Sequence, residues 1–300
     1  MLQAFALLLF HLPVSAALST AAAHRKTIAA STSASHIGSS RRSAVGSALV
    51  AALLTALPTA ASADETFEQL AAAAFASFEQ AKYADSERLW QKATAAFPSQ
   101  PLGWLNLAVA LVINASDEMT LGVEPTGRAK ERLEEALAAI DKAEALGGSG
   151  DALMLNSRGN ALGLLLRWED ARAAYAASAA AAPKDFVSIP RSNEALALLQ
   201  LGQLEQAEAV ARRLVRRDPN FRDGSALLAT LRSMQGDKAG AADAFSVVCD
   251  GRDGAAWCDR YSTEQVVLGR WTPKAVEAYR DLLGAPSIQL IIKNARVVPR

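Results

Sequence analysis

The stretch "LLRWEDARAAYAASAAAAPKDF", Leu165–Phe186, decides how the rest of the sequence is interpreted. It is rich in alanine, contains Tyr175, and reaches Pro183, which cannot continue a helix because proline lacks the backbone N–H. Upstream of it, the small residue Gly159 stands twelve positions before Ala171, and Tyr175 follows Ala171 by four. The stretch is therefore either low-complexity filler or one copy of a repeated unit.

The same spacing of small and large residues recurs along the chain, which favours a repeat. Alanine or serine marks the position where two helices approach closely, and a large residue such as Trp90 or Tyr175 fills the space beside it. We expect five repeats, at about 67–100, 101–148, 152–185, 188–221 and 222–255. The matching positions are Ser86, Trp90, Ala93 and Pro98; Ala136, Ile140 and Ala143; Ala171, Tyr175, Ser178 and Pro183; Ala207, Ala211, Leu214 and Pro219; and Ala241, Phe245 and Val248.

This pattern resembles the tetratricopeptide repeat (TPR), a unit of about 34 residues that forms two antiparallel helices. The resemblance implies an all-α fold, a helix-turn-helix superhelix (α-solenoid) in which each repeat buries its apolar face against its neighbours and one face is concave. We expect the repeats to occupy residues 64–255 and the C-terminal cap and tail to occupy 256–300.

Three segments interrupt or follow the repeats. The polar insert at about 114–128, "NASDEMTLGVEPTGR", predicts a loop, which is either a partner-binding tip or a tolerated insertion. Thr272 and Pro273 begin "TPKAVEAYRDLL", which predicts a capping helix because proline suits the first helical position. The last apolar stretch, "IQLIIKNARVV", predicts a strand or an extended docking segment.

The first 63 residues have the composition of a targeting region. They contain no Asp or Glu. A short apolar run at 2–16 is typical of a signal peptide, and the Ser/Thr/Ala-rich stretch after it is typical of a transit peptide. Arg41 and Arg42, the apolar run 44–57 and the small residues 61–63 then resemble a twin-arginine lumen signal.

This order of signals predicts import into a plastid (chloroplast) and then into the thylakoid lumen. We expect a mature protein that begins near Asp64 and has no permanent membrane span. Two alternatives stay open: a disordered tail with one anchoring helix at 44–57, and a periplasmic or membrane-anchored protein that keeps this segment. The chain has 31 basic and 31 acidic residues, and four of the basic ones lie before Asp64, so the remainder has a net charge of −4. That charge gives no reason to expect a nucleic acid partner.

A narrower resemblance begins at Asn156. The features N-x-R-G-N-A, W-E-x-A, R-x-N-x-A-L, R-R-x-P-N-F-x-D and a late R-W-x-P follow one another over Asn156–Leu283. In this order they resemble a group of TPR proteins of the thylakoid lumen in plants, with relatives in cyanobacteria. The resemblance implies a lumenal repeat protein whose molecular activity is poorly defined. Leu166 departs from the repeat pattern, because repeats usually carry glycine there.

Residues with enzymatic chemistry are scarce after the targeting region. All three histidines, at positions 11, 24 and 36, precede Asp64, and no phosphate-binding glycine loop is present. We therefore expect no enzyme, no cofactor and no metal site. The nine-residue spacing of Cys249 and Cys258 fits neither a redox CxxC nor a zinc knuckle. They form either a disulfide that joins the last repeat to the cap or two half-buried thiols, with a regulatory redox role as a third interpretation.

Polar residues on the first helix of several repeats are the candidate partner-binding residues. In TPR proteins these helices line the concave face, and Asn and Arg can bind peptide amides and carboxylates there. The alternative is that they bond to helix ends or neighbouring repeats. Some family members clamp a C-terminal carboxylate with Lys and Asn, but this chain lacks the Lys, so we do not predict that clamp. The candidates are Asn106, Asn156, Arg158, Asn160, Arg191 and Asn193.

A second polar feature is "RRLVRR", Arg212–Arg217, which is either a solvated helix face or a contact for an acidic partner. Taken together, the sequence predicts a non-enzymatic protein–protein interaction scaffold of the thylakoid lumen, active in assembly or maintenance of photosynthetic complexes. A permanent structural subunit of a photosystem-associated complex and an enzyme of unrecognised type are the alternatives.

Overall fold

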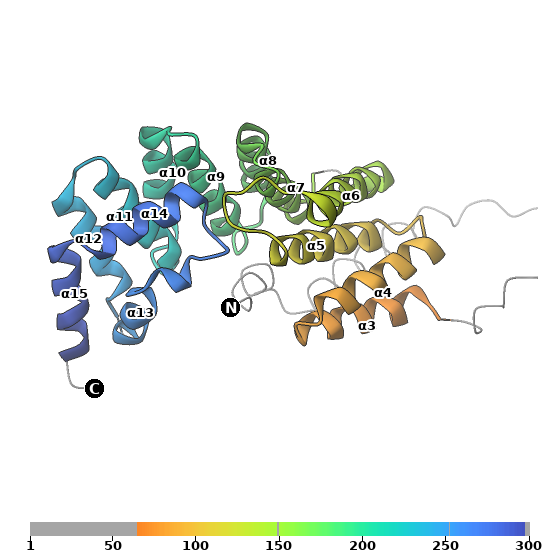
Figure 1. The fold of residues 1–300 in the computed structure, drawn as a ribbon, viewed down its shortest axis with the longest axis horizontal. Helices are drawn as coiled ribbons and strands as arrows, with labels where there is room; N and C mark the ends of the chain where they lie inside the picture. Colours follow the sequence, from red (N-terminus) through yellow and green to blue (C-terminus); the bar gives the residue numbers. More distant parts are fainter. Residues whose placement is uncertain (1–64, 149, 252, 298–300) are drawn as a thin grey trace, which may run out of the picture. The chain divides into compact units, whose positions relative to one another are not determined.

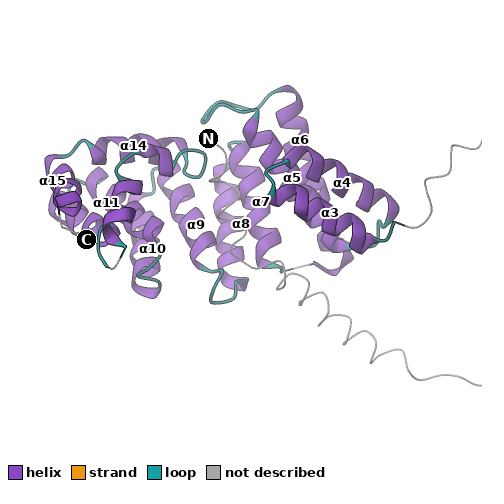
Figure 2. Cartoon of the chain, turned by 90° about the horizontal axis from the view of Figure 1, so that it is seen from below, coloured by secondary structure: helices purple, strands orange, loops and turns teal. Residues whose placement is uncertain are grey.

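The computed structural model describes residues 65–148, 150–251 and 253–297. The predicted signals within residues 1–63 lie outside this part of the chain. Every regular element that the structure describes is a helix, as Figures 1 and 2 show.

Ten of these helices form five successive pairs, and we call the first helix of each pair its A helix and the second its B helix. Each pair begins at the residue expected for the start of a repeat. Within a pair the two helices pack on each other, and each B helix also packs on the A helix of the next pair. This arrangement confirms the all-α TPR fold. The pairs are α3 (Phe67–Glu79) with α4 (Tyr83–Ala96), α5 (Pro101–Asp117) with α6 (Gly127–Ala143), α7 (Ala152–Leu164) with α8 (Trp168–Ala181), α9 (Ser188–Gln200) with α10 (Leu204–Arg217), and α11 (Arg222–Met234) with α12 (Lys238–Val248).

A short turn joins the A helix to the B helix, and in four repeats one of its residues has a positive φ. Gly202 and Gly236 supply it in the fourth and fifth repeats, with φ of 77° and 81°. Leu166 and Ala81 adopt φ of 60° and 57° at the corresponding places, although side chains with a Cβ are strained in this region. Leucine in place of glycine at position 166 therefore adds strain to the turn but leaves the geometry of the turn unchanged.

The small–large pattern works by close helix approach, which is clearest at Gly159. A Cβ on Gly159 would lie 2.4 Å from Cε1 of Tyr175, so only glycine lets α7 approach α8 this closely. Trp90 fills the corresponding space in the first repeat and is 2% exposed. The alanine-rich opening stretch is thus a helix whose small residues allow close packing.

The insert of the second repeat is shorter than the sequence predicted. Helix α5 continues to Asp117, because Asn114 is buried and its Nδ2 donates to the Tyr83 carbonyl oxygen at 3.1 Å and to Glu87 at 2.5 Å. Only residues 118–126 connect α5 to α6, and Gly127 already belongs to α6. The predicted loop boundaries, 114 and 128, were wrong at both ends.

Four elements follow the repeats: α13 (Gly254–Tyr261), η2 (Glu264–Val266), α14 (Pro273–Leu283) and α15 (Pro286–Val297). Helix α15 replaces the predicted strand or extended segment. Ile288 and Ile292 lie one helical turn apart and are buried, and Pro286 occupies the first helical position. Helices α13 and α15 pack on α12 and on each other, so they cover the end of the last repeat.

Helix α14 begins and ends where the sequence predicted, but it does more than cap. It packs across the A helices α9 and α11, in front of which it is drawn in Figure 1. Its Tyr279 is fully buried, stacks edge-on against Trp271 with ring centroids 5.2 Å apart, and donates from its hydroxyl to the Tyr261 carbonyl oxygen at 2.5 Å. Helix α14 is therefore part of the core.

Candidate functional site

The surface formed by the A helices, which we call the A-helix face, contains most of the polar residues singled out from the sequence. Asn156 on α7 is completely buried, and its Oδ1 accepts a hydrogen bond from Nδ2 of Asn193 on α9 at 3.0 Å. This bond joins the A helices of two neighbouring repeats. The Nδ2 of Asn156 is also buried, and it has no hydrogen-bond partner in the part of the chain that the structure describes.

Asn160 lies one helical turn after Asn156 on the same side of α7. Its Oδ1 accepts a hydrogen bond from the Tyr175 hydroxyl at 2.9 Å. Burial raises the pKa of Tyr175 well above its ordinary value, so the phenol stays protonated and remains a donor. Asn160 is half-buried, and its Oδ1 is already bonded to Tyr175. The Nδ2 of Asn160 is therefore the group of this amide that can bind a ligand.

The other predicted residues are separate from this amide group. Arg191 forms an ion pair with Glu194 of its own helix at 2.7 Å. Asn106 on α5 is buried and donates from Nδ2 to the Leu102 carbonyl oxygen at 2.8 Å, within the same helix. The structure thus brings together Asn156, Asn160 and Asn193.

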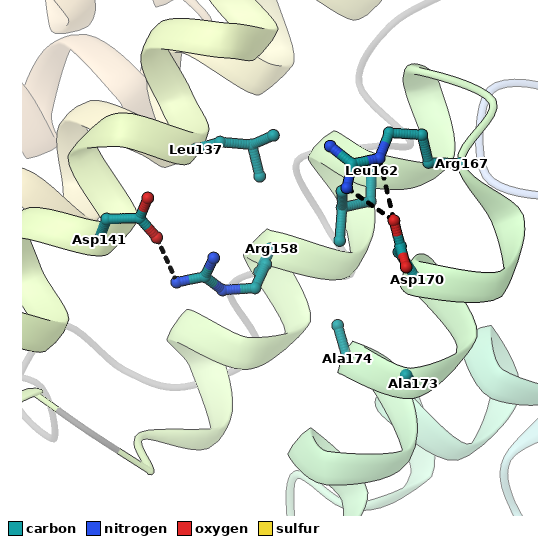
Figure 3. Close-up of a pocket in the computed structure, with 8 residues that line it drawn as sticks. All are labelled: Leu137, Asp141, Arg158, Leu162, Arg167, Asp170, Ala173 and Ala174. Carbon is teal, nitrogen blue, oxygen red and sulfur yellow. Dashed lines mark hydrogen bonds and ion pairs between the residues drawn. The ribbon is translucent and has the colours of Figure 1, made fainter.

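Arg158 points to a different part of the molecule. Its Nη2 lies 2.7 Å from Asp141 on α6 and 2.9 Å from Glu144. It lines an open pocket of about 470 Å³ between α6, α7 and α8, whose other arginine, Arg167, lies 2.6 Å from Asp170 (Figure 3). Because both guanidinium groups already face carboxylates, this pocket offers a ligand little unbalanced charge.

A buried ionic cluster that the sequence analysis missed joins the two motifs of the second half. Asp223, in R-R-x-P-N-F-x-D, forms a two-bonded ion pair with Arg270, in R-W-x-P, with Oδ2–Nη1 at 2.6 Å and Oδ1–Nη2 at 3.0 Å. The Tyr261 hydroxyl donates to the same carboxylate at 2.9 Å. Burial lowers the pKa of Arg270, but the charge of Asp223 and bonds to Asp223 and Tyr261 outweigh it and raise that pKa overall. No sequence rule pairs the two motifs across 47 residues.

This ion pair places α14 on the A-helix face of the fourth and fifth repeats. Lys274 donates from its backbone nitrogen to Oε1 of Gln200 at 3.0 Å and from Nζ to the Gln200 carbonyl oxygen at 2.8 Å. Pro273 also approaches the insert of the second repeat, since a Cβ on Gly122 would lie 3.1 Å from its Cγ. The protein's own helix therefore covers this part of the A-helix face.

The two cysteines form a disulfide, with Cα atoms 4.4 Å apart, so the structure has the first of the interpretations left open by the sequence. The bond joins the end of α12 to α13. Gly254 is required beside it, because a Cβ there would lie 2.2 Å from the Cys249 carbonyl oxygen. Arg222 also donates to backbone carbonyl oxygens at the end of α12, including that of Asp250 at 2.9 Å.

A second buried ion pair lies between the first two repeats. Arg132 Nε lies 3.1 Å from Glu87 Oε2, and Arg132 also contacts Glu118 at 2.5 Å. Burial and the charge of Glu87 raise the pKa of nearby Glu135, although Arg132 and Gln91 oppose this. Glu135 therefore binds a proton more readily than an ordinary glutamate does.

The described residues offer neither a clustered metal site nor a membrane-spanning helix. No group of three or more His, Cys, Asp or Glu side chains among them is placed to hold a metal ion. None of the described helices is both long enough and apolar enough to cross a membrane.

Comparison with known proteins identifies no family for this chain. No protein-family model matches it, and no curated protein matches it. Solved structures with a similar backbone include the three that follow, each with low identity to this chain. The crystal structure of PilW, described as a widely conserved type IV pilus biogenesis factor, is 17% identical, with 77% of this chain and 100% of PilW covered and a TM-score of 0.49.

Pseudomonas aeruginosa PilF is 17% identical, with 76% of this chain and 97% of PilF covered and a TM-score of 0.48. YrrB, described as a TPR protein with an unusual peptide-binding site, is 20% identical, with 68% of this chain and 97% of YrrB covered and a TM-score of 0.41. The assignment of the fold rests on the helix pairs themselves.

Proposed function

We propose that this protein is a non-enzymatic interaction scaffold that holds a segment of a partner protein on the A-helix face, where α7 meets α9. The observation that carries the proposal is the amide pair of Asn156 and Asn193. The buried Nδ2 of Asn156 lacks a partner in the described structure, and leaving such a donor unpaired costs about 1–3 kcal/mol. A backbone carbonyl or carboxylate of a partner would satisfy it once local movement admits the ligand.

The position of α14 limits where that partner lies. Since α14 covers α9 and α11, the partner approaches from the side of α7 and the earlier repeats. There Nδ2 of Asn160 and Oδ1 of Asn193, which has no hydrogen bond among the described residues, offer a donor and an acceptor at neighbouring places. This pair suits the alternating N–H and C=O groups of a peptide backbone.

We also propose that the protein works in the thylakoid lumen, in assembly or maintenance of photosynthetic complexes. The order of signals in residues 1–63 and the five sequence features between Asn156 and Leu283 support this compartment. A permanent structural subunit of a photosystem-associated complex would lie in the same compartment. It would differ from a scaffold because it would stay bound to the complex in a fixed stoichiometry.

Affinity purification of the tagged full chain from isolated thylakoids tests the proposal, with mass spectrometry of its N-terminus and its partners. We expect an N-terminus near Asp64, and partners that are lost in the double variant Asn156→Ala, Asn193→Ala. The matched control is Asn220→Ala, which removes an exposed amide elsewhere and should keep the partners.

Partners that persist unchanged in the double variant would refute the proposed binding surface. A chain that keeps residues 41–63, or that purifies without lumenal proteins, would refute the compartment. Recovery in fixed stoichiometry with one photosystem would identify the structural subunit instead.

A further inference from the structure

Four arginines form one outer face of helix α10, and we call Arg212, Arg213, Arg216 and Arg217 the arginine face. The opposite side of α10 packs into the core through Ala207, Val210, Ala211 and Leu214. All four arginines are exposed. The face is independent of the A-helix face, because α10 is a B helix.

Internal ion pairing does not explain these charges. Arg212 lies 3.9 Å from Glu208, at the limit of an ion pair, and Glu208 is also shared with Arg232 at 3.6 Å. Among the described residues, no carboxylate is within ion-pair distance of Arg213, Arg216 or Arg217.

Helix stability explains only part of the cluster. Cations in the last turn interact favourably with the helix dipole, which accounts for Arg216 and Arg217. Arg212 and Arg213 lie a turn earlier, and like charges four residues apart on a helix destabilise it. The pairs 212/216 and 213/217 therefore repel each other in the free protein, and a bound anion would relieve that repulsion.

We propose that the arginine face binds an acidic segment of a partner protein. Residues four apart on a helix are about 6 Å apart along its axis. Alternate residues of an extended chain are about 6.8 Å apart and point to the same side. A segment with Asp or Glu at every second position thus places one carboxylate at each level of the face, where guanidinium forks can bind carboxylates with two bonds.

Two other kinds of anionic partner fit less well. Binding to a lipid surface is strengthened by large apolar side chains beside the basic ones, and none of the large apolar residues exposed in the described structure lies on α8, α10 or α12. A nucleic acid needs a basic stripe that follows many phosphates, whereas this face is less than two turns long and the chain from Asp64 onward has a net charge of −4.

Fluorescence anisotropy with the purified full chain tests the proposal. The probe is a labelled peptide of four alternating Glu-Ser units, compared with an isomer in which the four Glu residues are consecutive. We expect the alternating peptide to bind more tightly than its isomer and to lose at least tenfold in affinity when all four arginines are changed to Gln. Thermal unfolding checks folding, and the quadruple variant should melt close to the parent, because the removed repulsion and the lost interaction of Arg216 and Arg217 with the helix dipole act in opposite directions.

The matched control changes four exposed basic residues elsewhere to Gln, so the net charge falls equally. Its affinity for the alternating peptide should stay within twofold of the parent. The control residues are Arg88, Arg128, Lys130 and Arg167.

An equal loss of affinity in the control would show general attraction to net charge and overturn the proposal. Equal binding of the two peptide isomers would overturn the spacing argument on which it rests. Binding to vesicles of anionic lipid without binding to the alternating peptide would replace it by a membrane contact.

Discussion

The ion pair between Asp223 and Arg270 gives the most stringent test of how α14 is held. Changing Arg270 to Gln leaves the Asp223 carboxylate buried, since the two side chains are only 9% and 8% exposed. Removing one partner of a buried pair costs about 3–5 kcal/mol. The Tyr261 hydroxyl still donates to Asp223, so we expect the lower end, a loss of about 3 kcal/mol in the free energy of unfolding.

Urea unfolding measures that loss, and hydrogen exchange locates it. Each tenfold change in exchange rate corresponds to about 1.4 kcal/mol, so a loss of about 3 kcal/mol should make the amides of α14 exchange roughly 100-fold faster in the Arg270→Gln variant. The double variant Asp223→Asn, Arg270→Gln should recover part of the loss, because it leaves no unpaired charge. Arg280→Gln is the control, since its ion pair with Glu264 is exposed and surface pairs contribute about 0–1 kcal/mol.

A loss below about 1 kcal/mol for Arg270→Gln would refute this reasoning. So would a double variant that is less stable than the single one, because the loss would then come from packing.

Four further predictions concern local structure. Gly159→Ala should destabilise the protein by up to about 2 kcal/mol in urea unfolding, because overpacking against Tyr175 costs about 1–3 kcal/mol and the gain in helix propensity returns only about 1 kcal/mol. Leu166→Gly should stabilise the protein by about 0.5–1 kcal/mol and raise Tm. A left-handed residue with a Cβ is strained by about 1–2 kcal/mol, and glycine removes that strain. Part of the gain is offset because glycine gives the unfolded chain more conformational entropy. Glu135→Gln should be more stable than the parent at pH 7, and the difference in the free energy of unfolding should shrink as the pH falls. A carboxyl whose pKa is raised in the folded state contributes stability in acid, and that stability is lost as the pH rises through the folded-state pKa. Gln does not titrate, so the variant has no such dependence. Reducing the disulfide between Cys249 and Cys258, which closes a short loop, should cost about 2–3 kcal/mol, measured by unfolding with and without a dithiol and absent in the Cys249→Ala, Cys258→Ala variant.

The repeats could be predicted from the sequence because their signals are local. The small residues at Gly159 and Ala171 and the proline at 183 mark where helices approach and end, and these requirements hold wherever the unit stands. Helix α15 was missed for a local reason too. A short apolar run suits either a strand or a helix, and the spacing of Ile288 and Ile292 together with Pro286 was the signal that could have decided it.

The candidate site was harder to predict, because bonding between repeats depends on which residues meet in three dimensions. The sequence identified Asn156 and Asn193 by their place on A helices, and the structure shows that they bond to each other. It did not show that Arg158 turns toward Asp141, because its neighbour comes from the preceding repeat. The pairing of Asp223 with Arg270 was out of reach for the same reason.

The way α14 returns to α9 has a consequence for truncation of the chain. TPR arrays are stabilised largely by contacts between neighbouring repeats, but Thr272 bonds to the Leu196 carbonyl oxygen across 76 residues. A chain that stops before α14 therefore leaves part of the surface of α9 uncovered. The last helices complete the fourth repeat, so the array cannot be shortened from its C-terminus one repeat at a time without exposing α9.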